Sequence, residues 1–363
     1  MKTRILAIFF GLMLVGCMRP QDASNNPNGD YATKIPAPAF QIFKQISDPN
    51  RPTRPFLGQY DGPIIDAHVH LDPPASGYYA KQYLENVLDE IKAAGVETAI
   101  FMPMPNEGRT VAKAQGENEK IDLLNLDRKR IKLLCGANYI IHWLDEANKN
   151  GYSETAFKNI LKKLNSDLDS GVYSGVGELA FHHFEKFTGQ RVISFPPNFE
   201  PFLRILDVIG QRSAWLDLHV EPITREGTSY EDEVFGGIEL FFRRCPNLKL
   251  IYSHTAMTNA RNVEAILKSY PRVVMNIKLV RNHDNWRNLE PVVNSEGEFY
   301  EDWAALFERM PERFLVGSDA KFARHGSVEA VYGKQIIQFR KALGSLSPKT
   351  ARMIAYENAL QIF

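Results

Sequence analysis

The stretch "PIIDAHVHLD", residues 63 to 72, begins like a buried β-strand and ends in two histidines one residue apart. Successive side chains of an extended strand point to opposite faces, so His68 and His70 share one face and Val69 lies on the other. Two imidazoles on one face can share a metal ion. Half-exposed histidines at a strand end would have the same local sequence, so distant residues must decide between the two interpretations.

From residue 63 onward, short β-branched runs alternate with longer amphipathic stretches, which is typical of βα units around a parallel sheet. Eight such units favour the α/β class and a closed (β/α)8 TIM barrel, because no glycine-rich dinucleotide turn follows the first strand. A helix ending at Gly95 and an extra C-terminal helix, starting near Ser347 and packing outside, are also expected. The predicted strands are PIIDAHVH from 63, VETAIFMPM from 96, IKLLCGANY from 131, GVYSGVGELAF from 171, AWLDLHV from 214, LKLIYSH from 248, RVVMNIKL from 272 and RFLVGSDA from 313.

The ends of these strands carry residue types that bind metals. The carboxyl ends of barrel strands form the active site, so their side chains are expected to converge. Taken singly, each has a structural explanation as a buried core imidazole, a solvent-facing charge or a helix cap. Together they predict a metal site. Its members are His68 and His70 after the first strand, Glu178 on the fourth, His219 on the fifth, His254 on the sixth and Asp319 on the eighth.

In this pattern the chain resembles the amidohydrolase superfamily over residues 63 to 361, with all six metal positions filled. The phrases "DAHVH" and "GSDA" look most like its amidohydrolase-related branch. Glu178 stands where many relatives have a carboxylated lysine, and in this respect the chain is similar to TatD-type deoxyribonucleases and some phosphotriesterase relatives. The number of metal ions therefore stays open.

The resemblance implies a divalent metal that activates a water molecule. Imidazole and carboxylate ligands suit Zn²⁺ best and also accept Mn²⁺, Fe²⁺, Co²⁺ or Ni²⁺. With Glu178 as a bridge, one ion would use His68, His70 and Asp319, and a second would use His219 and His254. Asp319 is the expected proton acceptor, and His254 or the second ion would polarise the substrate oxygen. The predicted reaction is hydrolysis of an ester, lactone, amide or phosphoester.

Two alternatives remain. Relatives resembling aminocarboxymuconate-semialdehyde decarboxylase use one metal to break a carbon–carbon bond, and a lipid-anchored protein could hold a metal without turnover. A nuclease role has little support, because Lys plus Arg and Asp plus Glu are balanced at 43 each. The expected partner is a small molecule, not nucleic acid, and the oligomeric state stays open. Candidate substrate-binding residues, which could equally be ordinary surface groups, are His182, His183, Lys278 and Arg281.

The N-terminus differs in composition from the rest of the chain. Lys2 and Arg4 precede the apolar run "ILAIFFGLMLVG", an order typical of an export signal. The closing "LVGC", residues 14 to 17, resembles the lipobox of bacterial lipoproteins, although an ordinary signal peptide would also explain it. We predict a signal peptide over 1–16, lipidation of Cys17, a proline-rich tether over 17–62 and the barrel over 63–363. The protein would be exported and held on the bacterial cell envelope, on the outer membrane or facing the periplasm, by its lipid alone. Cys135 and Cys245 are expected to be buried thiols.

Overall fold

The computed structural model describes residues 50–71, 81–105, 117–184, 192–280, 290–322 and 331–363. The predicted signal peptide, Cys17 and the tether up to residue 49 lie outside these ranges, as does the substrate candidate Arg281.

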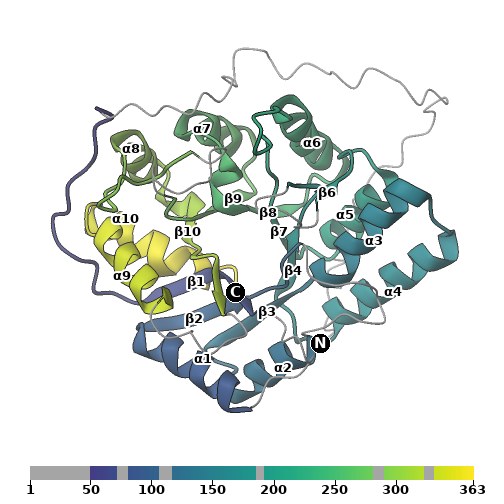
Figure 1. Ribbon diagram of the computed structural model, residues 1–363, viewed down its shortest axis with the longest axis horizontal. Helices are drawn as coiled ribbons and strands as arrows, with labels where there is room; N and C mark the ends of the chain where they lie inside the picture. Colours follow the sequence, from purple (N-terminus) through teal and green to yellow (C-terminus); the bar gives the residue numbers. More distant parts are fainter. Residues whose placement is uncertain (1–49, 72–80, 106–116, 185–191, 281–289, 323–330) are drawn as a thin grey trace, which may run out of the picture.

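All eight predicted strands are present, and they pair in parallel around the centre of the molecule (Figure 1). The order across the sheet is β10-β9-β8-β7-β4-β3-β2-β1-β11, and β5 and β6 form a separate antiparallel pair. The strands are β1 (Ile64–Leu71), β2 (Val96–Phe101), β3 (Ile131–Gly136), β4 (Gly175–Leu179), β5 (His182–His183), β6 (Ile193–Ser194), β7 (Trp215–Leu218), β8 (Lys249–Tyr252), β9 (Val273–Ile277), β10 (Phe314–Val316) and β11 (Ala320–Phe322).

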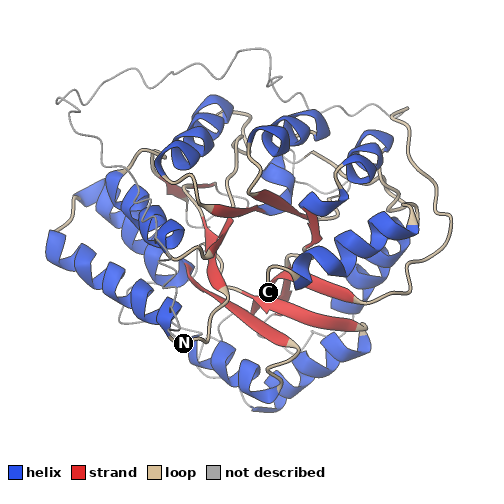
Figure 2. Cartoon of the chain, turned by 180° about the vertical axis from the view of Figure 1, so that it is seen from behind, coloured by secondary structure: helices blue, strands red, loops and turns tan. Residues whose placement is uncertain are grey.

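The eighth strand of the barrel is split into β10 and β11. β10 pairs with β9, and β11 pairs with β1, so residues 314–322 connect the last strand back to the first. Within the split, the Gly317 amide donates to the Ile277 carbonyl and the Asp319 amide donates to the His68 carbonyl. Figure 2 shows the resulting ring of strands surrounded by helices, and the predicted barrel is confirmed.

The helices follow the strands as expected for βα units. Helix α1 buries Leu84, Val87, Leu88 and Ile91, which is the spacing of one helical face, and Gly95 after it has a φ of +69°. The α-helices are α1 (Lys81–Ala93), α2 (Glu117–Leu126), α3 (Ala137–Asn150), α4 (Glu154–Asp169), α5 (Glu200–Gln211), α6 (Glu231–Arg244), α7 (Ala260–Ser269), α8 (Glu301–Arg309), α9 (Val331–Leu343), α10 (Pro348–Arg352) and α11 (Asn358–Leu360). Shorter helical turns are η2 (Ser253–Met257), η3 (Pro311–Arg313) and η4 (Met353–Glu357).

One strand boundary differs from the prediction. The run "IKLLCGANY" was expected to be extended throughout, but β3 ends at Gly136 and α3 begins at Ala137. Gly136 has a φ of +107°, a backbone conformation that glycine adopts readily and residues with a Cβ atom rarely do. The glycine therefore allows the chain to turn at this point. Cys135 and Cys245 are buried and free, as expected.

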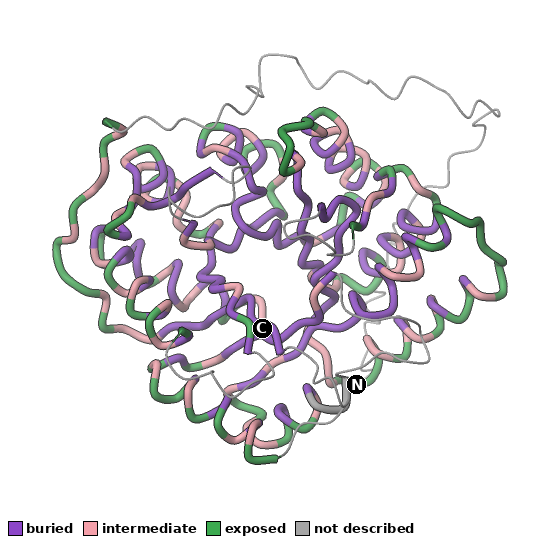
Figure 3. The backbone as a smooth tube through the Cα atoms, viewed as in Figure 1, coloured by how far each residue is buried: buried purple, intermediate pink, exposed green. Residues whose placement is uncertain are grey.

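The barrel interior forms a core of its own, separate from the layer between strands and helices. Ile65, Ile100, Leu134, Ile251 and Leu315 pack together inside the ring, and the most buried parts of the chain surround the barrel axis (Figure 3). The C-terminal helix begins after Ser347, whose side chain accepts from the Thr350 amide. The prediction that it packs outside is wrong for its last residues, because they join the interior cluster. These residues are Tyr356, Ala359, Ile362 and Phe363.

Residues 50–62, the end of the predicted tether, lie along the barrel. Arg51 forms ion pairs with Glu290 (2.6 Å) and Asp302 (2.7 Å), and Thr53 forms an antiparallel bridge with Tyr300. The domain boundary at 62 stays a prediction. No helix in the described part of the chain is long and apolar enough to cross a membrane.

Candidate metal centre at the carboxyl end of the barrel

His68 and His70 point their Nε2 atoms at one another across 3.1 Å. Both rings are buried at the carboxyl end of β1. His70 Nδ1 donates to the carbonyl of Met102 (3.0 Å), the residue just after β2. That hydrogen bond orients the ring so that Nε2, the atom that would bind a metal, faces the site.

The Glu178 carboxylate lies among the four histidines that come from β1 and from the ends of β7 and β8. Its Oε1 is 2.8 Å from His219 Nδ1, 3.5 Å from His68 Nε2 and 3.6 Å from His254 Nε2. Its Oε2 is 3.4 Å from His70 Nε2. One buried carboxylate therefore contacts all four imidazoles that the sequence singled out.

His254 and Asp319 both sit in left-handed turns directly after strands. Their φ angles are 58° and 51°, a conformation that costs energy for residues other than glycine and is most common at functional sites. Asp319 Oδ1 is 3.1 Å from His70 Nε2, and Asp319 Oδ2 accepts a hydrogen bond from Lys278 Nζ. The buried Asp66 carboxylate stabilises the turn at Asp319, because it accepts hydrogen bonds from both the amide and the hydroxyl of Ser318.

A second layer of buried polar residues orients the histidines. His68 Nδ1 donates to Asp217 Oδ2 (3.2 Å), and Asp217 also accepts from the Ser253 hydroxyl. Asn276 Nδ2 donates to Ser253 Oγ (2.8 Å), and Asn276 Oδ1 accepts from the His254 amide (2.8 Å). On the other side, His219 Nε2 donates to the fully buried Glu221 (3.1 Å). These partners leave the opposite ring nitrogens of His68 and His219 facing Glu178.

The sequence reasoning did not identify this second layer. Asp217 lies two residues before His219 and Glu221 two residues after it, so strand periodicity was an available signal for both. Asn276 similarly lies two residues before Lys278. Ser253 had no such signal, because it adjoins His254 in the turn η2.

The electrostatics of the cluster keep both carboxylates ionised and favour a proton on His68. Burial lowers the pKa of His68, but Asp217 and Glu178 outweigh it and raise that pKa well above its usual value, so a cation would take the place of that proton. Burial raises the pKa of Glu178, but the surrounding His68 and His219 outweigh it and hold that pKa well below its usual range. Burial likewise opposes ionisation of Asp319, and Lys278 and His254 reverse it, so its pKa is also well below normal. Burial lowers the pKa of His254 to about 3, so this imidazole is neutral.

All six predicted metal ligands come together in the structure, and the donor set fits a divalent cation. Their atoms form overlapping groups of three, each group within 4.8 Å: His68, His254 and Asp319; His68, His70 and Glu178; and Glu178, His219 and His254. Buried groups of imidazole and carboxylate ligands of this kind suit zinc and similar ions.

The predicted substrate-binding residues lie in different surroundings. Lys278 contacts Asp319, and the His183 ring centroid is 5.1 Å from that of His219. His183, His219 and Glu221 form a fourth group with metal-ligand atoms within 4.8 Å. The His219 to Glu221 hydrogen bond accounts for part of that proximity. His182 contacts Ser194, Glu233, Phe184 and Tyr230.

Replacing Asp217 by Asn is expected to weaken metal binding while leaving the barrel folded. The amide keeps the shape of the side chain but removes the charged acceptor that orients His68. Loss of such an outer carboxylate typically costs about 10- to 100-fold in metal affinity. Competition with a chromophoric chelator measures this affinity. Asp89→Asn on the exposed face of α1 is the matched control, and equal affinities in the two variants would contradict the expectation.

Comparisons with known proteins show the fold. No family model matches the chain, and no curated protein matches its sequence. Among solved structures, a probable 2-pyrone-4,6-dicarboxylic acid hydrolase from Acinetobacter baumannii has a TM-score of 0.50 at 10% identity, covering 82% of this chain and 98% of its own. An uncharacterised TIM-barrel protein from Bordetella bronchiseptica has a TM-score of 0.48 at 12% identity, covering 83% and 98%. A TatD homologue from Escherichia coli has a TM-score of 0.49 at 14% identity, covering 83% and 97%. The similarity to the Acinetobacter structure, at 10% identity, concerns the fold and extends no further.

Proposed function

We propose that the protein is a metal-dependent hydrolase of the amidohydrolase superfamily, acting on an ester, lactone, amide or phosphoester of a small molecule. One observation carries the proposal. The Glu178 carboxylate lies among four buried imidazoles, with Asp319 beside them at the open end of the barrel. Six convergent ligand atoms are more than a structural metal would require.

In this proposal the ligands divide into two sets joined by Glu178. His68, His70 and Asp319 would hold one ion, and His219 with His254 would hold a second. The bound metal, most suitably Zn²⁺, supplies an acidified water and polarises the substrate oxygen. The hydrolase name of the Acinetobacter protein is consistent with this reaction, but the proposal rests on the ligand set of this chain.

Asp319 is proposed to move the proton. Its carboxylate is ionised and held by Lys278, so it can accept a proton from the attacking water and pass it to the leaving group. His254 is neutral and faces both Glu178 and Asp319, which suits a ligand or a group that contacts the substrate oxygen. His183 and Lys278 are proposed as substrate contacts, and the support is that they lie beside His219 and Asp319.

The test is a substrate screen with the full chain loaded with Zn²⁺ or Mn²⁺. We expect turnover of at least one member of a panel of lactones, esters, amides and phosphoesters, and loss of that turnover after chelation. Metal analysis is expected to give about two equivalents per chain. One equivalent, together with carbon dioxide release and no hydrolysis, would instead favour the decarboxylase alternative.

The setting of the enzyme is also a proposal. We propose that residues 1–16 direct export and that lipidation of Cys17 anchors the barrel to the cell envelope. The support is the sequence pattern of the first 17 residues.

A further inference from the structure

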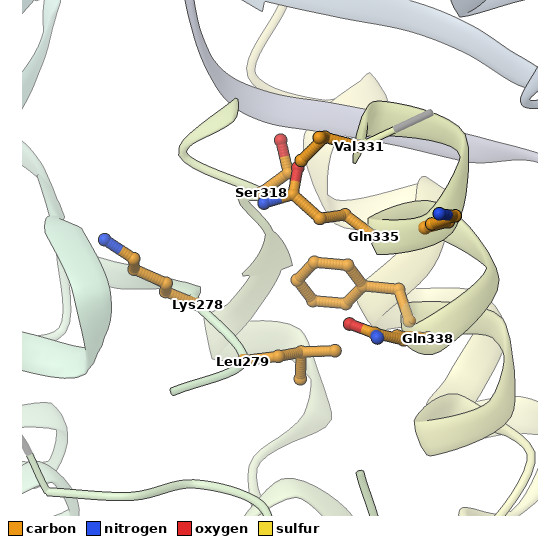
Figure 4. Close-up of a pocket in the computed structure, with 8 residues that line it drawn as sticks. Lys278, Leu279, Ser318, Val331, Gln335 and Gln338 are labelled. Atoms are coloured by element: carbon orange, nitrogen blue, oxygen red, sulfur yellow. The ribbon is translucent and has the colours of Figure 1, made fainter. Parts of the chain in front are cut away.

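A cavity of about 350 Å³ opens beside the candidate metal centre, between the end of β9 and the first turns of α9 (Figure 4). Its volume falls within the range of small-molecule sites. Two of its lining residues connect it to the centre. Ser318 immediately precedes Asp319, and Lys278 donates a hydrogen bond to the Asp319 carboxylate. The lining residues are Lys278, Leu279, Ser318, Val331, Lys334, Gln335, Gln338 and Phe339.

The polar part of this lining is rich in hydrogen-bond donors. It contains two lysines and two glutamines, and no carboxylate is among the described residues that line it. Lys278 is already paired with Asp319, whereas Lys334 has no acidic partner within the described ranges. Lys334 and Gln335 also lie near the N-terminus of α9, where the helix dipole favours an anion.

The side-chain amide of Gln335 also has a polar atom without a hydrogen-bond partner among the described residues. Its Oε1 is buried and has no hydrogen-bond partner in the described part of the chain. Buried amides are rarely left unsatisfied, and an amide can rotate by half a turn to present its N–H groups instead. Turned in this way, the Gln335 amide would present N–H donors in place of the unpaired oxygen.

The remaining wall is apolar. It is formed by Leu279, Val331 and Phe339. A ligand that fills the cavity would therefore combine an anionic group with a short apolar chain.

We propose that this cavity is a substrate subsite that binds a carboxylate carried on a short apolar chain, with Lys334, Gln335 and Gln338 as its donors. The proposal deepens the proposed function and rests on it for the identity of the reaction. A substrate seated here would place its neighbouring atoms beside Asp319. The enzyme would then select carboxylate-bearing esters, lactones or amides over neutral ones.

The experiment measures binding, so that it does not depend on turnover. Calorimetric titration of the zinc-loaded full chain compares hexanoate with hexanamide, which has the same length and no charge. We expect hexanoate to bind at least about five-fold more tightly. Lys334→Met should weaken hexanoate about five-fold, because one partly solvated charge-assisted hydrogen bond is lost, and should leave hexanamide unchanged.

Lys341→Met, an exposed lysine near the other end of α9, is the matched control and should change neither dissociation constant. The subsite is refuted if hexanoate binds no more tightly than hexanamide, or if the Lys334 and Lys341 variants behave alike. The substrate panel is scored separately. A chain that shows the binding difference but hydrolyses no panel member would refute the hydrolase and not the carboxylate site.

Discussion

Asp319→Asn is expected to reduce kcat by about 10³-fold at saturating metal, which is within the range for loss of a general base. The substitution keeps the size of the side chain, and its amide can still face Lys278 and His70. It removes the ionised carboxylate that the proposal assigns as the proton acceptor. Steady-state kinetics on any substrate found in the panel, with metal content determined on the same sample, measures the effect.

Two controls separate chemistry from folding and metal loss. Asp89→Asn makes the same chemical change on the surface of α1 and should leave kcat unchanged. Circular dichroism of Asp319→Asn should show the parent fold, because Asp66 holds the turn through Ser318, although loss of the buried ion pair with Lys278 should lower the midpoint of thermal unfolding. Retention of kcat within ten-fold would show that another residue moves the proton.

The sequence predicted those site residues whose position depends only on lying at the end of a strand. The β-branched runs located the strands, and the carboxyl ends of parallel strands meet at one mouth, so His68, His219 and His254 were expected together. Glu178 and Asp319 followed from the same reasoning. These positions needed no detail beyond strand order.

The sequence could not predict how local turns aim each group. β1 has a register shift between Asp66 and Val69, so Asp66 contacts Ser318 and Tyr332 although strict alternation would place it beside His68. The eighth strand is interrupted between Val316 and Ala320, where Asp319 lies. The hydrophobic pattern of the sequence did not predict this interruption. The packing of Ile362 and Phe363 against the interior cluster was also missed, since a terminal helix has the same amphipathic pattern whether it packs on the side or on the end of the barrel.

The Glu178→Gln variant is expected to bind one metal ion fewer per chain than the parent. Glu178 lies within 4 Å of all four imidazoles of the two proposed ligand sets, including His219 Nδ1 at 2.8 Å. The neutral amide can still accept hydrogen bonds, but it cannot balance the charge of two cations. The affinity of the more weakly held ion should fall by more than about 100-fold, beyond the range for outer residues such as Asp217.

Metal analysis after dialysis measures this loss, and Glu233→Gln is its matched control. Glu233 also lies beside a histidine, 3.6 Å from His182, but is not a member of any of the groups of metal-ligand atoms. We expect the control to keep about two equivalents per chain and Glu178→Gln to keep about one. Hydrolysis should fall with the lost ion, because His219 and His254 would retain no bridging carboxylate. If both variants keep the metal content of the parent, Glu178 does not bridge two ions, and the division of the ligands into two sets is wrong.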